Sequence, residues 1–578
     1  MYADDRNAQI VLSLLKKYNI KKIVVSPGTT NVPIARSVQI DPFFEVYSVV
    51  DERSAAYFAT GLAFESGEAV VISCTGATAS RNYLSGLTEA YYRNLPIIAL
   101  TSQASVSDYG NFTPQVTDRT VSQNDIKRIA VHLPIIKSAK DDEAWVLSVN
   151  RALTMATMNG CGPVHINLLV DKFTCNEPAL PDIPKIEYYQ SEDLLGDTRS
   201  RLIQQLTGKR VGIFIGSHRK ISSDENKAIE AFIDTYDVVV FYEHTSNYHG
   251  KNAALFSSVD DLKKLKDKPD IMVDIGGVVG DYFPRHLFTD GECWRVSEDG
   301  KFHQRYGNLR KQFSSSERFF FERLADNEAA STHEYYKLVS KLVETIVVPE
   351  LPLSNAFISQ KMAELLPKGC SLHLGILNSL RNMNFFRLDE SIDSSCNVGG
   401  FGIDGAVSTL IGQSMVNKER LYFGQIGDLA FFYDMNALGI RHIGKNIRIL
   451  LINNGRGVEF RLNPTINEPI GDDLDEFICA AGHFGSAKDW SESMGFEYMA
   501  ARNKEEFLDK IDLFCSPDIN QFNGPVLFEV FTTLKDEQEA VKMIRSANTP
   551  VNLTSNTKDF ARRIVPKKAQ NAIRKIIK

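Results

Sequence analysis

Short runs of aliphatic and β-branched residues alternate along this chain with longer stretches whose apolar residues recur at helical spacing. The short runs in the first third are residues 21–28, 68–76, 95–103 and 162–170, and the helical stretches between them include residues 54–66 and 79–93. Apolar residues stand at consecutive positions in most of the short runs, as in strands that are buried on both faces. This pattern predicts a parallel sheet with helices on each side.

The same pattern recurs twice more along the chain. A proline-rich polar stretch at 175–193 separates the first set from the second, and a third set begins near residue 350. We therefore predict an α/β fold of three doubly wound parallel-sheet domains, followed by a basic tail. The predicted boundaries are 1–185, 186–345, 346–550 and, for the tail, 551–578. The first and third sets share one order of strand, glycine-rich turn, helix and late Gly-Pro-Val strand, which suggests an internal duplication.

Charge and composition indicate which kinds of binding partner and which cellular compartment to expect. The net charge is −7 with a pI near 6.0, so nucleic acid is not expected as a partner. The eight cysteines are scattered, as expected for reduced thiols in the cytoplasm. Between Lys558 and Lys578 the tail has eight Lys or Arg and one Asp. It suits either an amphipathic anchor on a membrane surface or a solvated flexible end.

A Gly-Asp pair ends one strand of the third set, in the stretch FGQIGDLAFFYDMNALGIRHIGKNIRILLINNGRG at 423–457. Residues 429–442 have helical spacing, so Asp428 lies between a strand end and a helix N-terminus. Backbone N–H groups and the helix dipole favour phosphate oxygens there. The next strand ends at Asn454, and adjacent parallel strands would bring the two side chains to one sheet edge.

These residues suggest a magnesium-diphosphate site. The Asp428 carboxylate, the Asn454 amide oxygen and the Arg456 carbonyl, with two phosphate oxygens and a water, would make a shell of about six oxygens, which suits Mg²⁺. The alternative is an ordinary turn with an aspartate cap and an Asn-Asn-Gly loop. The residues alone leave both open.

The motif resembles the diphosphate-binding motif of thiamine-diphosphate (ThDP) enzymes. GDLAFFYDMNAL and GGFGIDGAVSTLIG resemble the branch that contains the menaquinone-pathway carboligase, SEPHCHC synthase, and TGATASRNYLSGLTEAYYRNLPIIALTSQ is nearer to acetolactate synthase. The resemblance covers most of residues 20–175 and 370–535. It implies that ThDP and Mg²⁺ bind at an interface between subunits of a homodimer or homotetramer.

The resemblance also implies roles for individual residues. Gly427, Asp428, Leu429 and Asn454 match the diphosphate motif, with Leu429 where most members have glycine. Glu52, in the stretch SVVDERSAAY, matches the glutamate that contacts the pyrimidine nitrogen and favours the imino tautomer. From the residues alone, Asp51-Glu52 is better explained as the solvated, charged start of a helix.

Three further positions are candidates for the reaction centre. Ile403 matches the apolar residue that holds the cofactor bent, and it also suits a core isoleucine. Gln115 lies in a loop where relatives have a glutamine facing the reacting carbon, but it also suits a polar surface position. His483 is a candidate acid or substrate contact, with a structural histidine as the alternative.

The chain departs from the SEPHCHC synthase pattern at its substrate arginines. Positions that hold arginine in that branch are Thr30, Ala104, Met383 and Val398 here. Arginine forks suit carboxylates, and these replacements remove both charge and donors. The remaining candidates for substrate binding are Thr29, Thr30, Ser379 and Arg381, and Arg381 or Arg81 could compensate in part. From these positions we expect a role other than menaquinone synthesis.

Together these features predict a ThDP- and Mg²⁺-dependent carboligase. It would decarboxylate a 2-oxo acid and transfer the acyl carbanion equivalent to a carbonyl acceptor, as a transferase or lyase. Two alternatives remain: a simple 2-oxo acid decarboxylase, and a ThDP-binding structural or regulatory subunit without activity.

Overall fold

A computed structural model of the chain describes residues 1–548 except 105–107, 119–122, 159, 282–284, 289, 306 and 327–329. It contains three parallel sheets, of six, seven and six strands. The predicted α/β class of three parallel-sheet domains is therefore confirmed. The predicted tail, 551–578, lies outside the described residues. No helix in the described part of the chain is long and apolar enough to cross a membrane.

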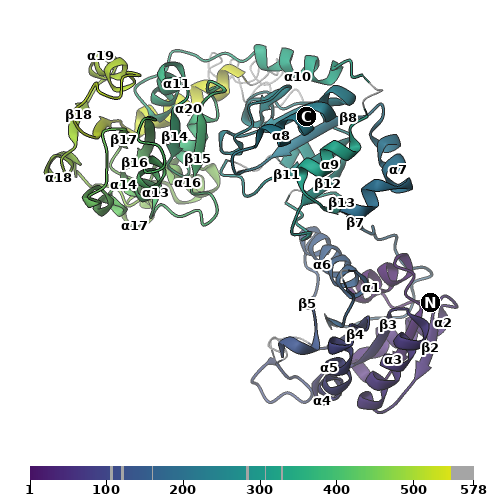
Figure 1. Cartoon of the computed structure of the whole chain (residues 1–578). Helices are drawn as coiled ribbons and strands as arrows, with labels where there is room; N and C mark the ends of the chain where they lie inside the picture. The colour runs from purple at the N-terminus through teal and green to yellow at the C-terminus, as the bar shows by residue number, and fades with distance from the viewer. Residues whose placement is uncertain are drawn as a thin grey trace, which may run out of the picture. The chain divides into compact units, whose positions relative to one another are not determined.

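The first sheet has the strand order β2-β1-β3-β4-β6-β5 (Figure 1). Its strands are β1 (Lys22–Val25), β2 (Glu45–Ser48), β3 (Val70–Thr75), β4 (Ile97–Gln103), β5 (Ile129–Leu133) and β6 (Val164–Leu169). Its helices are α1 (Arg6–Lys17), α2 (Val32–Ile40), α3 (Glu52–Ser66), α4 (Ala77–Asn82), α5 (Leu84–Tyr92) and α6 (Ala139–Thr157). Successive residues of β1 enter opposite cores: Ile23 packs with α1, α2 and α6, and Val24 packs with α3 and α5. Because both faces of β1 are covered, it has apolar residues at consecutive positions.

The central sheet has the order β10-β9-β8-β11-β12-β13-β7. Its strands are β7 (Glu187–Gln190), β8 (Arg210–Ile215), β9 (Asp237–Tyr242), β10 (Ala253–Leu255), β11 (Ile271–Ile275), β12 (Glu292–Ser297) and β13 (Leu309–Ser314). Its helices include α7 (Asp197–Leu206), α8 (Ser223–Thr235), α9 (Glu317–Leu324) and α10 (Glu334–Glu344). The strand order reverses between β8 and β11, where α/β sheets usually bind ligands.

The third sheet has the order β15-β14-β16-β17-β19-β18. Its strands are β14 (Ser371–Leu374), β15 (Asp393–Cys396), β16 (Tyr422–Gly427), β17 (Ile447–Asn453), β18 (Glu497–Ala501) and β19 (Val526–Phe531). Longer helices around it are α11 (Asn355–Leu365), α13 (Ala406–Ser414), α19 (Lys504–Phe514) and α20 (Leu534–Asn548), and shorter ones are α12 (Asn378–Met383), α14 (Asp428–Tyr433), α15 (Val458–Leu462), α16 (Pro464–Ile470), α17 (Leu474–Phe477) and α18 (Lys488–Ser493) (Figure 1). The first and third sheets follow one permutation of their six strands.

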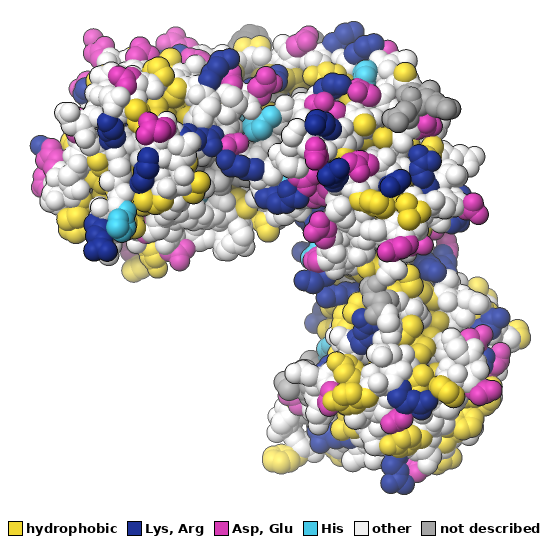
Figure 2. All heavy atoms as spheres, in the orientation of Figure 1, with side chains coloured by type: hydrophobic (Ala, Val, Ile, Leu, Met, Phe, Trp, Pro, Cys, Tyr) yellow, Lys and Arg dark blue, Asp and Glu magenta, His cyan; other side chains and the backbone are white. Residues whose placement is uncertain are grey.

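The chain forms two compact units, which are described separately. The N-terminal unit comprises residues 1–190 and 299–314, and the C-terminal unit comprises 191–298 and 315–578. Hydrophobic side chains are visible on the surface of the N-terminal unit in Figure 2. Some of them lie on α3, the helix that begins at Glu52.

Candidate functional site

In the N-terminal unit, the loops after β1 and β3 meet at the carboxyl edge of the sheet. A Cβ placed on Gly28 would lie 2.7 Å from the Cβ of Thr75, so glycine is needed for this close approach. The Thr30 hydroxyl contacts that of Thr75 and donates to the Ser102 carbonyl at 2.8 Å. Thr29 is exposed in the same loop. Because β1 and β3 lie where the strand order reverses, this edge is the expected place for a ligand.

Glu52 lies at this edge as the first residue of α3. Asp51 caps the helix by accepting from the Arg53 N–H at 3.0 Å, so the neighbouring acid takes the capping role. Glu52 Oε2 accepts a hydrogen bond from Asn82 Nδ2, at the end of α4, at 3.2 Å. Glu52 is partly exposed. Its carboxylate is therefore oriented by an amide and remains accessible to a ligand.

In the C-terminal unit, Asp428 directly follows β16 and is almost completely buried. Its Oδ2 accepts from the backbone N–H groups of Asn454 at 3.0 Å and Gly455 at 2.6 Å. Its Oδ1 accepts from the Leu429 N–H at 2.8 Å. Burial raises the pKa of Asp428 above its ordinary value, and the Leu429 and Gly455 N–H groups and His483 act against that rise.

The Asn-Asn-Gly turn lies beside Asp428, as the strand pairing predicts. β16 and β17 pair in parallel register. Asn454 Oδ1 accepts from the Arg456 N–H at 3.3 Å, and the Arg456 side chain bonds to Asp475 at 2.8 Å. A Cβ on Gly427 would meet no described atom within 4 Å, so space is open beside the aspartate. Carboxylate, amide and carbonyl oxygens are ligand types that suit Mg²⁺, and phosphate oxygens would complete its shell.

His483 completes this cluster. Its Nε2 lies 3.0 Å from Asp428 Oδ2, and its ring packs edge-on against Phe432 with centroids 5.4 Å apart. Gly482 N–H donates to the Gly455 carbonyl at 3.1 Å, and Asn453 Nδ2 donates to the Gly485 carbonyl at 2.9 Å. The loop that carries His483 is thus attached to the Asn-Asn-Gly turn on both sides of the histidine.

A buried carboxylate on β19 holds the same loop. Glu529 is fully buried and accepts from Asn453 Nδ2 at 2.8 Å, from the Ser486 hydroxyl at 2.6 Å and from the Tyr498 hydroxyl at 2.7 Å. The Ala487 N–H donates to both of its oxygens at 3.2 Å. Glu529 therefore fixes the loop and the end of β17 together.

The helix expected over residues 429–442 is shorter in the structure. The α-helix α14 ends at Tyr433, and a 3-10 turn (Met435–Gly439) follows. Asp434 accounts for the break, because its carboxylate accepts from both the N–H (2.6 Å) and the hydroxyl (2.7 Å) of Ser408 on α13. A side chain that bonds away from its own helix favours termination at this point.

The other predicted site residues lie in different surroundings. Gln115 is exposed in a loop, with a left-handed φ of 64°. Ile403 is partly buried and packs against both cores of the third domain. Ser379 is buried in α12, and the nearby Arg381 guanidinium forms an ion pair with Glu459. None of these four is brought into contact with Asp428 by the hydrogen bonds of the described residues.

In the central domain, two loops close on each other where the strand order reverses. The Gly277 N–H donates to the Ser217 carbonyl at 2.6 Å, and the Ser217 N–H donates to the Val278 carbonyl at 3.1 Å. A Cβ on Gly276 would lie 2.9 Å from the Gly216 carbonyl oxygen. The glycine-rich stretch after β11 thus serves close packing of two loops.

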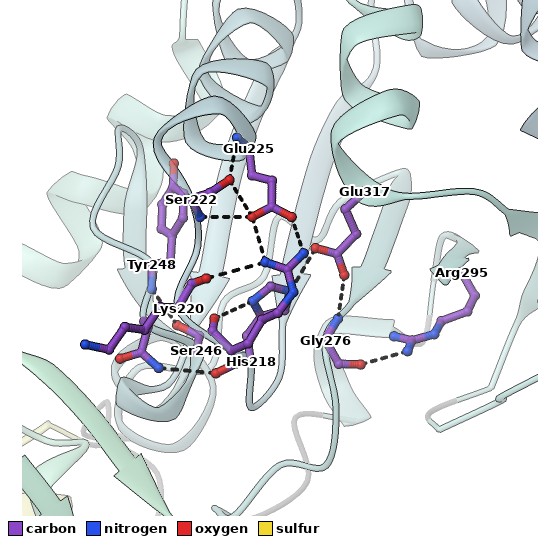
Figure 3. A network of polar contacts seen from close by, with 11 residues as sticks. His218, Lys220, Ser222, Glu225, Ser246, Tyr248, Gly276, Arg295 and Glu317 are labelled. Atoms are coloured by element: carbon purple, nitrogen blue, oxygen red, sulfur yellow. Dashed lines mark hydrogen bonds and ion pairs between the residues drawn. The ribbon is translucent and has the colours of Figure 1, made fainter. Parts of the chain in front are cut away.

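Side chains reinforce this closure (Figure 3). Glu317, at the start of α9, bonds to His218 Nε2 at 2.9 Å and accepts from the Gly276 N–H at 3.4 Å. Arg295 Nη2 donates to the Gly276 carbonyl at 2.7 Å. Burial alone would lower the pKa of His218, but Glu317 outweighs burial and raises it. The network in Figure 3 therefore joins the loops after β8 and β11 to α9 and β12.

Comparison with known proteins identifies the family. The model described as "Thiamine pyrophosphate enzyme, N-terminal TPP binding domain" matches residues 6–130. A 2-succinyl-5-enolpyruvyl-6-hydroxy-3-cyclohexene-1-carboxylate synthase of Bacteroides thetaiotaomicron is 31% identical over 556 residues, covering 94% of this chain and 98% of the relative. The chain belongs to the thiamine-diphosphate enzymes, in the family of this synthase.

Further relatives of this ThDP enzyme have the same description. The synthase of Phocaeicola vulgatus is 31% identical over 94% of this chain and 98% of the relative, and that of Flavobacterium johnsoniae is 26% identical over 91% and 96%. A solved structure, the thiamine diphosphate-dependent 4-hydroxybenzoylformate decarboxylase of Rhodococcus jostii RHA1, is 17% identical with a TM-score of 0.44 and covers 91% of this chain and 99% of that chain.

The expectation of a role outside menaquinone synthesis is contradicted by these relatives. They are 26–31% identical along nearly the whole chain and are named for the SEPHCHC synthase reaction. The expectation relied on four positions, of which Met383 and Val398 are buried in the apolar core here. The inference failed because the loss of arginine at particular positions does not show that carboxylates are bound nowhere else.

We call the residues around Glu52 the Glu52 half-site and those around Asp428 the Asp428 half-site. The sequence did not indicate two of their residues, Asn82 in the first and Glu529 in the second. Asn82 carries no local signal, because its partner Glu52 is 30 positions away. Glu529 does carry one: it is the single charged residue in the apolar run VLFEVF. A charge in a strand buried on both faces must be paired or hydrogen-bonded, and that rule would have indicated it.

Proposed function

We propose that this ThDP enzyme catalyses the carboligation for which its relatives are named. The main support is the 31% sequence identity to the Bacteroides thetaiotaomicron synthase over 94% of the chain. Further support comes from Asp428 and Asn454 at strand ends and from Glu52 at the start of α3. When bound, ThDP supplies an electron sink for a carbanion generated from a 2-oxo acid. The rest of the reaction depends on how the chain binds the cofactor and the substrates.

The name of the relatives gives the product of their reaction, and the product shows which bond is made. A succinyl group joined to C2 of a cyclohexene carboxylate corresponds to a five-carbon 2-oxo dicarboxylic acid that has lost CO₂. The new bond joins the donor carbonyl carbon to ring C2, and a proton is added at ring C1. The acceptor is then a ring double bond conjugated with a carboxylate, in place of the carbonyl acceptor expected from the sequence.

In this proposal Asp428, Asn454 and the Arg456 carbonyl would hold Mg²⁺, and the metal would supply positive charge for the cofactor diphosphate. Among the described residues no cluster of three His, Cys, Asp or Glu side chains could hold a metal. A shell with one carboxylate therefore needs phosphate oxygens to complete it. Glu52 would share a proton with the pyrimidine ring of the cofactor, and Asn82 Nδ2, which donates to its carboxylate, would orient it.

We also propose that a second copy of the chain completes each site. Glu52 belongs to the N-terminal unit and Asp428 to the C-terminal unit. Large apolar side chains are exposed near both: Tyr57 and Phe58 on α3, and Phe484 in the His483 loop, which is 97% exposed. Exposed apolar residues beside a ligand site commonly mark a protein interface. A homodimer would bury them and bring the two half-sites together.

The direct test is turnover with a defined donor and acceptor. The purified protein with ThDP and Mg²⁺ is given 2-oxoglutarate, with and without a 5-enolpyruvyl-6-hydroxycyclohexadiene carboxylate, while CO₂ and the adduct are measured. We expect CO₂ release to depend on the acceptor and the adduct to form. Release of CO₂ without adduct would favour the simple decarboxylase. No turnover in either arm would contradict the proposal.

Glu52→Gln provides the matched control, since it keeps the shape and removes the carboxylate. We expect it to retain ThDP binding and to lose most turnover, by roughly a hundredfold or more, as general acid-base catalysts do. Asp428→Ala should instead weaken Mg²⁺-dependent ThDP binding, measured by titration of protein fluorescence. Turnover in Glu52→Gln equal to wild type would refute the role of this residue.

A further inference from the structure

The N-terminal unit contains a cavity of about 290 Å³ beside the Glu52 half-site. It lies between α4, α5 and the strands β4 and β6, with the 3-10 turn Asn124–Ile126 on one side. Leu84, Leu87, Ala99 and Ile126 form its apolar wall. The cavity therefore offers an apolar surface large enough for a small ring.

The polar side of this cavity is cationic. Among the described residues that line it, the charged ones are the two cations Arg81 and Lys127 and one acid, Asp118, and Lys127 Nζ also donates to the Gln123 carbonyl at 2.8 Å. Arg81 is exposed, and no described acid forms an ion pair with it. A guanidinium beside an apolar wall suits a ligand with a carboxylate and a hydrocarbon body.

Polar groups of the cavity wall are already engaged by their neighbours. The Tyr83 side chain lines the cavity and is fully buried, with its hydroxyl beside the Cys74 thiol and the Ser26 hydroxyl. Thr101 Oγ1 donates to Asn167 Oδ1 at 2.9 Å, and His165 Nε2 lies 2.8 Å from the same hydroxyl. Recognition of an anion would therefore fall to the cationic side chains of the cavity.

Cations of the C-terminal half-site are already engaged. Arg381 forms an ion pair with Glu459, and Arg456 forms one with Asp475. Met383 and Val398 are core residues. Arg381 and Arg456 are therefore partly neutralised, whereas no described acid forms an ion pair with Arg81 in the N-terminal unit.

We propose that this cavity is a carboxylate subsite, with Arg81 and Lys127 holding the carboxylate and the apolar wall contacting a ring. The identity of the acid as the cyclohexadiene carboxylate acceptor rests on the proposed function. α4 links the subsite to the reaction centre, because Arg81 lines the cavity and the adjacent Asn82 bonds to Glu52. Arg81 would thus determine specificity in place of the arginines absent at Thr30 and Ala104.

Binding of a simple probe tests the subsite without turnover. Cyclohex-1-ene-1-carboxylate is titrated into the full-length protein by calorimetry, in parallel with its neutral carboxamide. We expect the acid to bind and the carboxamide to bind about ten- to a hundredfold more weakly, since a hydrogen bond to a charged group is lost. Arg81→Gln and Lys127→Gln should each lower the affinity for the acid by a similar factor. Arg81→Lys should bind the acid more tightly than Arg81→Gln does.

The matched control is Arg36→Gln, an exposed arginine on α2 outside the cavity, which should bind the acid as wild type does. Equal binding of acid and carboxamide, no binding of the acid, or an unchanged affinity in both Arg81→Gln and Lys127→Gln would overturn the subsite. Affinity that depends on Arg81 without any turnover would overturn the proposed function alone. Turnover with an unchanged acceptor KM in Arg81→Gln would overturn the subsite alone.

Discussion

Glu537 is the most strongly perturbed carboxyl group near the Asp428 half-site. It is almost completely buried on α20, where it accepts from the Asn355 N–H at 3.0 Å and from the Thr532 hydroxyl at 2.6 Å. Burial raises its pKa to about 7, although both donors favour the ionised form. Its charge is therefore absent in weak acid and present above neutrality.

This perturbation predicts a pH-dependent stability. An acid whose pKa is higher in the folded state binds more protons when folded, so its contribution to stability falls as pH rises from about 4.5 to about 7. Relative to Glu537→Gln, which is always neutral, the wild-type protein should lose about 3 kcal/mol across that window. Melting temperatures of both proteins between pH 4.5 and 8 measure this, and a constant difference would contradict it.

His483 predicts a second effect at the residue scale. Removing its Nε2 takes one donor from Asp428 Oδ2, and loss of a group that orients a metal ligand weakens binding by roughly tenfold or more. We expect His483→Ala to reduce Mg²⁺-dependent ThDP affinity by about that factor in a fluorescence titration. His442→Ala, an exposed histidine of the same unit, should leave the affinity unchanged. Equal affinities for the two variants would count against the role.

At the element scale, α3 and α5 approach each other at Gly86. A Cβ on Gly86 would lie 2.5 Å from the Cβ of Ala56 on α3, closer than any packed core allows. We expect Gly86→Ala to separate the helices and lower stability by about 1–3 kcal/mol, as overpacking does. Because α3 begins at Glu52, turnover should fall as well.

Gly61, on α3, is the control, because a Cβ there would meet no described atom within 4 Å. Gly61→Ala should raise stability by about 0.5–1 kcal/mol through helix propensity alone. Both variants are compared with wild type by thermal melting. If Gly86→Ala melted at the wild-type temperature, the close approach of α3 and α5 would not be needed for stability.

The sequence predicts elements well where both faces of a strand are buried. β17 alternates between two cores, with Ile449 and Leu451 in one and Leu450 and Ile452 in the other, so it reads as a continuous apolar run. The long helix after Asp428 was not realised, because the Asp434–Ser408 contact that ends it joins residues 26 positions apart. Apolar periodicity carries no information about such a polar contact.

At the scale of the whole molecule, the proposed dimer predicts complementation between two inactive variants. If each site takes Glu52 from one chain and Asp428 from the other, a hybrid of Glu52→Gln with Asp428→Ala contains one intact site and one doubly altered site. Random reassortment of equal amounts should restore about a quarter of wild-type turnover. The two variants are unfolded together, refolded and assayed; no recovery, with wild type recovering fully, would place each site within one chain.

The sequence indicated the cofactor more clearly than the substrate for a physical reason. Asp428 and Asn454 directly follow two paired strands, and parallel register places such strand ends together. Carboxylate recognition needs only a cation at the right point in space, which any nearby element can supply. Arg81 stands on α4, 51 positions from Thr30 along the chain, and only the cavity shows its relation to the half-site.

The shared strand order of the first and third sheets has an evolutionary consequence. In the first sheet the acid follows the second strand of the chain, as Glu52 after β2; in the third sheet it follows the third strand, as Asp428 after β16. At the place equivalent to Asp428, the first sheet has Gly76 and Ala77 after β3, which offer no carboxylate. Under the proposed function, the shared layout lets the loops of one domain share a proton while the loops of the other hold a cation. Each role would then be set by local substitutions that leave the scaffold of both domains intact.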